Sequence, residues 1–126
     1  MTSINTKRQI GLVATFTVLA WLGEYVHNLA ELPLLTVLSP ENSIPALVFL
    51  LLFAGWWWLP YKRVTAILII VWAILHLVGG AIITVIPFPF LPFYPEQSLR
   101  HYLAHLFYGL TQLPLIGIMA LQIRHS

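Results

Sequence analysis

The hydrophobic positions of the chain fall into four long apolar segments, separated by short polar or proline-rich stretches. These segments cover residues 9–31, 44–59, 64–86 and 100–123. A helix of about 20 residues crosses a hydrocarbon layer of about 30 Å, so the segments predict membrane-spanning helices, although 44–59 is short. Pro60 and Pro87 stand at segment borders, which is typical of helix ends because the residue before proline disfavours helical geometry.

The composition supports this interpretation. The chain is 60% hydrophobic and 8% charged, whereas soluble domains carry about 25% charged residues. So few charges do not cover a soluble globule with polar surface. We therefore predict an all-α protein: a single domain, residues 1–126, forming an up-and-down four-helix transmembrane bundle in contact with the lipid bilayer.

The placement of the charges predicts the orientation. Five of the six basic residues fall on one side of a four-pass hairpin: Lys7, Arg8, Lys62, Arg63 and Arg124. The positive-inside rule then puts both termini in the cytoplasm, and we expect a multi-pass protein of a bacterial inner membrane. The net charge of +2 is too small to indicate nucleic acid, and the absence of cysteine excludes disulfides and thiolate metal sites.

The predicted outer loop between the third and fourth segments, PFPFLPFYPEQ (87–97), is unusual. It has four prolines and four aromatic residues in eleven positions. Proline lacks an N–H donor and fixes φ, so this stretch cannot form a helix. It is also too apolar to extend into water, so we expect it to lie on the outer membrane surface or to cap the bundle. A docking patch for a partner protein is the alternative.

Ionisable side chains within the segments gather in the predicted outer half of the membrane. With a rise of about 1.5 Å per residue, Glu24, His27, His76 and His105 lie roughly 18–27 Å above the cytoplasmic ends, and His101 lies near the outer surface. Glu24 and His27 are three residues apart, and His101 and His105 four, so each pair shares a helix face. Such groups are costly in lipid unless paired, so we expect them to face one another inside the bundle.

Several chemistries fit these residue types, and the sequence leaves them open. One transition-metal ion held by His27, His76 and His105, with Glu24 as a ligand or base and His101 as a further or outer-shell ligand, is the leading hypothesis. Haem b with His27 and His105 as axial ligands is a second, because these residues have matching depths on different helices. A quinone or bacteriochlorophyll bound by one histidine is a third. The structural alternative is that each imidazole simply hydrogen-bonds a neighbouring group.

Residues 76–114 resemble the YjdF-like family of small bacterial membrane proteins of unknown function. The positions that carry the resemblance are His76, Gly79, Pro87, His105 and Gly109, while His101 stands where the family has an aspartate. The resemblance covers about a third of the chain. It implies a polar site shared by the third and fourth segments, and it implies no reaction.

These observations lead to two functional hypotheses. The first is a small membrane protein with a His/Glu site that binds a metal ion or a metal-containing cofactor. The second is an accessory subunit of a larger respiratory or photosynthetic membrane complex, without catalysis of its own. No recognisable nucleophile arrangement is present, so enzymatic activity stays open.

Overall fold

All regular structure in the described part of the protein is helical. The computed structural model describes the backbone of residues 3–32 and 34–125, and within these ranges the side chains from Thr6 onward. The elements are α1 (Ser3–Glu31), α2 (Pro40–Trp58), α3 (Lys62–Ile74), the π-helix η1 (Leu75–Ile82), the short 3₁₀ helix η2 (Ile83–Val85) and α4 (Leu99–Arg124). Together α3, η1 and η2 form one continuous rod.

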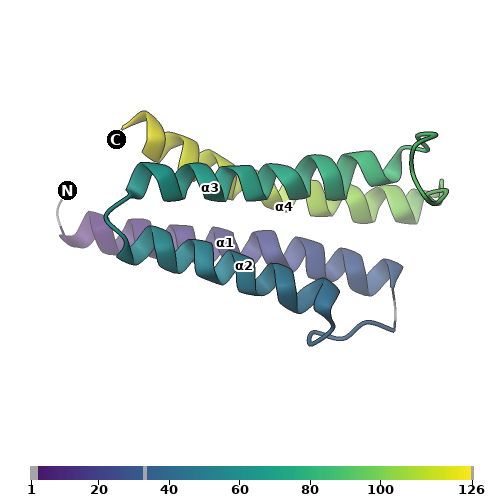
Figure 1. Ribbon diagram of the computed structural model, residues 1–126, viewed down its shortest axis with the longest axis horizontal. Coiled ribbons are helices and arrows are strands. Elements are labelled where there is room, and N and C mark those ends of the chain that lie inside the picture. The colour runs from purple at the N-terminus through teal and green to yellow at the C-terminus, as the bar shows by residue number, and fades with distance from the viewer. Residues whose placement is uncertain (1–2, 33, 126) are drawn as a thin grey trace.

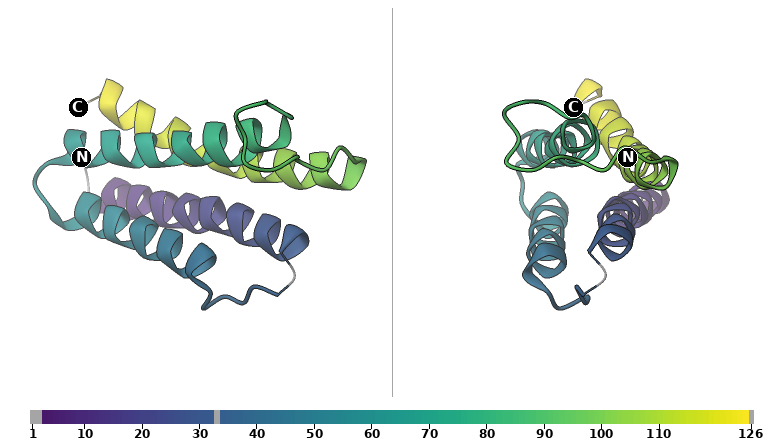
Figure 2. Two further views of the ribbon diagram at one scale, coloured as in Figure 1. Left: turned by 45° about the vertical axis from the view of Figure 1, so that its right-hand side comes forward. Right: turned by 90° about the vertical axis from the view of Figure 1, so that its right-hand side faces the viewer.

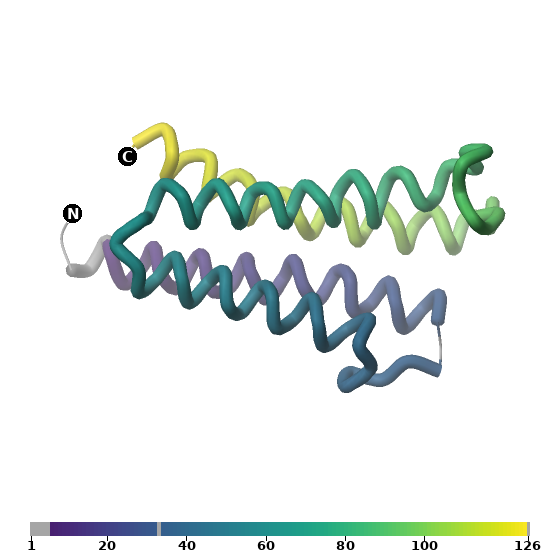
Figure 3. The backbone as a smooth tube through the Cα atoms, viewed as in Figure 1, coloured from purple at the N-terminus to yellow at the C-terminus, as the bar shows by residue number. Residues whose placement is uncertain are grey.

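The helices form an up-and-down four-helix bundle, as predicted (Figure 1). Viewed end-on, they occupy the corners of a ring in which α4 packs on α1 and α3, and α2 packs on the same two helices (Figure 2). The first turns of α1 and the last turns of α4 lie at one end. We call the opposite end, where residues 34–39 and 86–98 form loops, the distal end (Figure 3). The side of a membrane that each end faces stays a prediction.

Three of the rods are long and apolar enough to cross a membrane: Thr6–Glu31, Lys62–Val85 and Leu99–Arg124. Helix α2 has 19 residues, but its first turn carries the polar side chains of Glu41, Asn42 and Ser43. The apolar part of α2 is therefore shorter than that of the other rods, as the sequence indicated, and its crossing of the membrane stays a prediction.

Local sequence explains where the distal helices begin. Ser98 precedes α4, and its side chain accepts a hydrogen bond from the backbone N–H of His101 at 3.2 Å. This is an N-cap, which satisfies one of the unpaired donors at a helix start. Helix α2 begins with Pro40, a residue suited to the first helical position because its missing N–H would have no helical partner there. These starts place His101 and Asn42 at the distal end.

An apolar core fills the part of the bundle near the termini. Its fully buried members include Val13 on α1, Ala66 on α3, and Leu115 and Met119 on α4. Small residues bring the helix backbones together where the core meets the polar distal half: a Cβ added to Gly23 of α1 would lie 1.7 Å from the hydroxyl oxygen of Thr111 on α4. This close approach sets the spacing of α1 and α4 next to the polar side chains.

We predict that Gly23→Ala destabilises the bundle, because the added methyl group must push α1 away from α4. Overpacking of this kind costs about 1–3 kcal/mol. The matched control is Gly11→Ala in the same helix, where a Cβ meets no atom within 4 Å. Thermal unfolding in detergent, followed by circular dichroism, should show a lower midpoint for Gly23→Ala only. Equal midpoints for the two variants would contradict the close approach.

Candidate functional site

A cavity of about 450 Å³ with both polar and apolar lining residues lies between α1, the η1–η2 segment and α4 in the distal half of the bundle. Its walls carry five acidic or imidazole side chains, three other polar side chains and three small or apolar residues. The lining residues are Glu24, His27, Asn28, Glu31, Leu32, Gly80, Thr84, Phe93, His101, His105 and Tyr108. The polar side chains of α1 and α4 therefore face one another inside the bundle, as their spacing predicted.

Two imidazoles from opposite walls meet in this cavity. The Nε2 atoms of His27 on α1 and His105 on α4 lie 3.0 Å apart. The rings stand nearly perpendicular, with their planes at 82° and their centroids 4.4 Å apart. The sequence predicted matching depths and an inward orientation for these two residues, but it did not predict their direct contact.

The tautomer of His27 follows from its neighbour Asn28. The Nδ2 atom of Asn28 donates to the amide oxygen of Asn42 at 2.8 Å and to the backbone carbonyl of Glu41 at 3.3 Å. A carbonyl oxygen only accepts, so these contacts fix which end of the Asn28 amide is nitrogen. The remaining oxygen lies 3.1 Å from Nδ1 of His27. That nitrogen must donate, which leaves Nε2 of a neutral His27 without a hydrogen.

The tautomer of His105 is set by the backbone of η1. Its Nδ1 lies 2.9 Å from the carbonyl oxygen of Ala81. Since this oxygen only accepts, Nδ1 donates and Nε2 of a neutral His105 carries a lone pair. Ala81 belongs to a π-helical segment, and such segments occur frequently at functional sites because they alter the regular pairing of backbone groups.

The two anchored tautomers have a chemical consequence. In their neutral forms both Nε2 atoms are acceptors, and two lone pairs facing each other at 3.0 Å repel. A proton shared by the rings or a cation bound to both relieves this repulsion. Anchoring of the far ring nitrogen by a carbonyl or an amide is also how proteins orient imidazoles that bind metals.

His76 occupies a separate part of the site. Its Nδ1 is hydrogen-bonded to the hydroxyl of Tyr108 and lies 3.7 Å from Oε2 of Glu24. Nε2 of His76 and Oε2 of Glu24 are buried without a hydrogen-bond partner in the described structure. The ring of Tyr108 also contacts His27, with centroids 5.2 Å apart, so it connects this deeper group to the imidazole pair.

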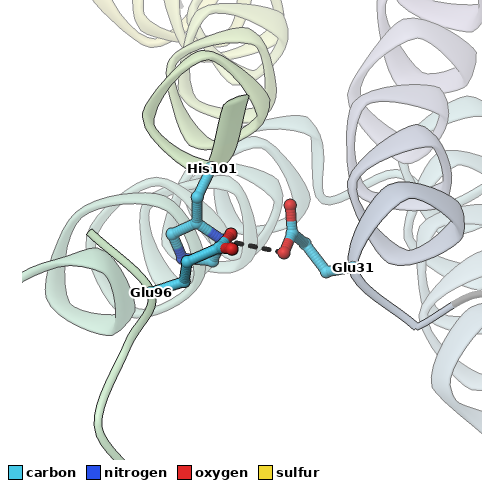
Figure 4. A group of neighbouring side chains, drawn as sticks. All are labelled: Glu31, Glu96 and His101. Atoms are coloured by element: carbon cyan, nitrogen blue, oxygen red, sulfur yellow. Dashed lines mark ion pairs between the residues drawn. The ribbon is translucent and has the colours of Figure 1, made fainter. Parts of the chain in front are cut away.

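A second group lies at the mouth of the cavity. Figure 4 shows Glu31, Glu96 and His101 pointing toward one another from the end of α1, the loop before α4 and the first turn of α4. Nδ1 of His101 lies 2.8 Å from Oε2 of Glu31 and 4.0 Å from Oε2 of Glu96. Arg100 pairs with both carboxylates, at 3.6 Å and 3.3 Å, and donates to the backbone carbonyl of Ala30.

The structure thus brings the predicted site residues together as three connected groups. Within residues 3–32 and 34–125, one set of three potential ligands has donor atoms that all lie within 4.8 Å of one another, namely Glu31, Glu96 and His101. His27 and His105 contact each other directly, whereas His76 is bonded to Tyr108. The metal-ligand roles of Glu24, His27, His76, His101 and His105 stay predictions.

Sequence reasoning missed Tyr108, Asn42 and the Ala81 carbonyl. Tyr108 had a detectable signal, because it follows His105 by three residues and shares its helix face. Asn42 and Ala81 had none. Their roles depend on how α2 and η1 pack against α1 and α4, which a pattern along one chain does not reveal.

Comparison with known proteins finds no family model, no curated protein and no solved structure that matches the chain. The resemblance of residues 76–114 to the YjdF-like family therefore stays a prediction.

We predict that Tyr108→Phe destabilises the protein by about 1–3 kcal/mol, because it removes a partner of buried His76. Tyr108 is 4% exposed. The control is Tyr102→Phe, since Tyr102 is 43% exposed and its hydroxyl bonds Gln97 at the surface. The free energy of unfolding of both variants is measured in mixed detergent at a fixed pH. A Tyr108→Phe protein as stable as the Tyr102→Phe protein would show that the buried hydroxyl contributes little.

Proposed function

We propose that this chain is a small integral membrane protein that binds one divalent transition-metal ion through the Nε2 atoms of His27 and His105. The observation that carries the proposal is the 3.0 Å contact between two nitrogens whose tautomers are set by acceptors on their far sides. Neutral imidazole is a good ligand for zinc, copper, iron and nickel. A cation at this point converts a repulsive contact into two coordinate bonds.

The separation of the two nitrogens supports a bare ion over haem. Two nitrogens at about 2.0–2.1 Å from one tetrahedral ion are about 3.3 Å apart. The observed 3.0 Å requires only a small adjustment. Axial ligands on opposite faces of a haem iron must be about 4 Å apart with the macrocycle between them, twice a metal–nitrogen bond of about 2.0 Å. Haem therefore needs a larger rearrangement of α1 against α4.

The carboxylates of the cavity supply the negative charge that such an ion requires. Two neutral imidazoles bring none, and an uncompensated double charge in a lipid-surrounded bundle is costly. Glu24 and Glu31 line the same cavity as the imidazole pair. Oε2 of Glu24 is buried without a hydrogen-bond partner in the described structure and lies 3.7 Å from Nδ1 of His76, so this carboxylate can balance a bound ion directly or through water.

The prediction is that protein purified without an affinity tag binds close to one equivalent of Co²⁺ or Zn²⁺, measured by elemental analysis after dialysis. His27→Ala and His105→Ala each lose a ligand and should weaken binding at least about tenfold. His125→Ala is the matched control, because His125 is the C-cap of α4, at the end of that helix opposite His101.

Circular dichroism checks that each variant is folded. The proposal would be contradicted if wild-type protein bound no metal at micromolar free Co²⁺. It would also be contradicted if His125→Ala weakened metal binding as much as His105→Ala does.

One observation favours the second candidate, an accessory subunit of a larger membrane complex. The distal loops expose large apolar side chains, including Leu34 at 95%, Leu38 at 82% and Tyr94 at 77%. Apolar groups of this kind mark contact surfaces with lipid or with a partner.

If a partner covers these side chains, native extraction in mild detergent should yield a complex much heavier than one 14.3 kDa chain with its detergent micelle. A free single chain would count against this role.

A further inference from the structure

The group at the mouth of the cavity has the composition of a second cation site. Glu31 is the last residue of α1, Glu96 lies two residues before the Ser98 cap, and His101 is in the first turn of α4. The donor atoms of these three residues all lie within 4.8 Å of one another. Two carboxylates and one imidazole suit zinc, manganese or iron, with water completing the coordination.

The burial of His101 is an independent sign that this group has a ligand. The residue is 8% exposed, and neither ring nitrogen makes a hydrogen bond within the described structure. Nδ1 is the ion-pair partner of Glu31, 2.8 Å from its Oε2, whereas Nε2 has no polar partner in the described structure. Buried polar atoms of native proteins are almost always hydrogen-bonded or bound to an ion or water. The bare Nε2 of His101 therefore leaves a role for an ion or a water molecule at this ring.

Arg100 now occupies the position of a competing cation. Its guanidinium reaches Glu96 at 3.3 Å and Glu31 at 3.6 Å. The side chains of Arg100 and Glu96 are 61% and 52% exposed, so water and salt screen this ion pair and it holds the two side chains together only weakly. Arg100 also donates to the carbonyl of Ala30 at 3.0 Å. It can therefore release Glu96 and stay attached to the end of α1.

Two of the three residues at the mouth share one cavity with the imidazole pair. Glu31 and His101 line it together with His27 and His105, and the rings of His101 and His105 have centroids 4.4 Å apart. The ring of His101 alone therefore separates an ion held at the mouth from the ring of His105.

We infer that Glu31, Glu96 and His101 form an outer cation position, where a divalent transition-metal ion displaces Arg100 before it moves to His27 and His105. The transfer step rests on the proposed function, whereas the outer position does not. The exchange is purely electrostatic: one guanidinium leaves the carboxylates and one hydrated cation replaces it.

The test is stopped-flow absorbance of Co²⁺ binding to the full chain in detergent. Glu96→Gln should slow association about tenfold and slow release by a similar factor, leaving the equilibrium constant within about twofold. If this group only joined α1 to α4, Glu96→Gln would not slow association and release by the same factor. Glu41→Gln is the matched control, because it removes the same exposed distal charge outside the cavity.

The variant Arg100→Gln should change the association rate of Co²⁺ in the opposite direction. Removing the competing cation should speed association several-fold, whereas the loss of a merely structural ion pair would not speed it. If Glu96→Gln and Glu41→Gln behave alike, or if Arg100→Gln slows association, the outer position is refuted and the inner site is unaffected.

A second measurement separates this inference from the proposed function. In the double variant His27→Ala/His105→Ala, the outer position should still bind Co²⁺ weakly, and adding Glu96→Gln should abolish that binding. Co²⁺ binding that depends on Glu96 but not on His27 or His105 would sustain the outer position and refute the inner site. If the double variant binds no Co²⁺ while wild type does, the outer position is refuted.

Discussion

Polar side chains in a bundle surrounded by lipid must find their partners within the protein, because the bilayer offers none. In this chain the constraint acts on one half of the bundle only. Near the termini the interior is apolar, while in the distal half imidazoles, carboxylates and amides face a shared cavity. The contact of His27 with His105 is one place where hydrogen bonds alone do not meet this constraint, because the Nδ1 atoms of both rings already donate and two Nε2 lone pairs are left facing each other.

The architecture supports this contact from several directions. Gly23 lets α1 approach Thr111 of α4, and buried Gln112 of α4 donates to the backbone carbonyl of Ala20 on α1. Asn42, fully buried at the start of α2, holds the amide that orients His27. The π-helix η1 supplies the carbonyl that orients His105. Helix α2 and the η1 segment thus each orient one imidazole of the pair without contributing a member of it.

The fold was predictable because hydropathy and proline placement act locally, one segment at a time. The four helices begin and end within a few residues of the predicted limits at most borders, and α2 begins earlier because Ser39 and Pro40 start the helix in a polar turn. The facing of His27 and His105 followed from the high cost of leaving ionisable side chains in lipid, which turns them toward the bundle interior. The separation of His76 did not, because it depends on Tyr108 and on the packing of η1 against α4, which is a property of three-dimensional neighbours.

The most direct test of this account is the hydrogen on each ring nitrogen of His27 and His105. ¹⁵N NMR of histidine-labelled, metal-free protein, at a pH where both rings are neutral, reports it for each residue. The account predicts hydrogen on Nδ1 and a bare Nε2 in both rings, with the two Nε2 signals alone shifting when Zn²⁺ is added. A hydrogen on Nε2 of either ring, with a bare Nδ1, would mean that the two imidazoles simply bond each other.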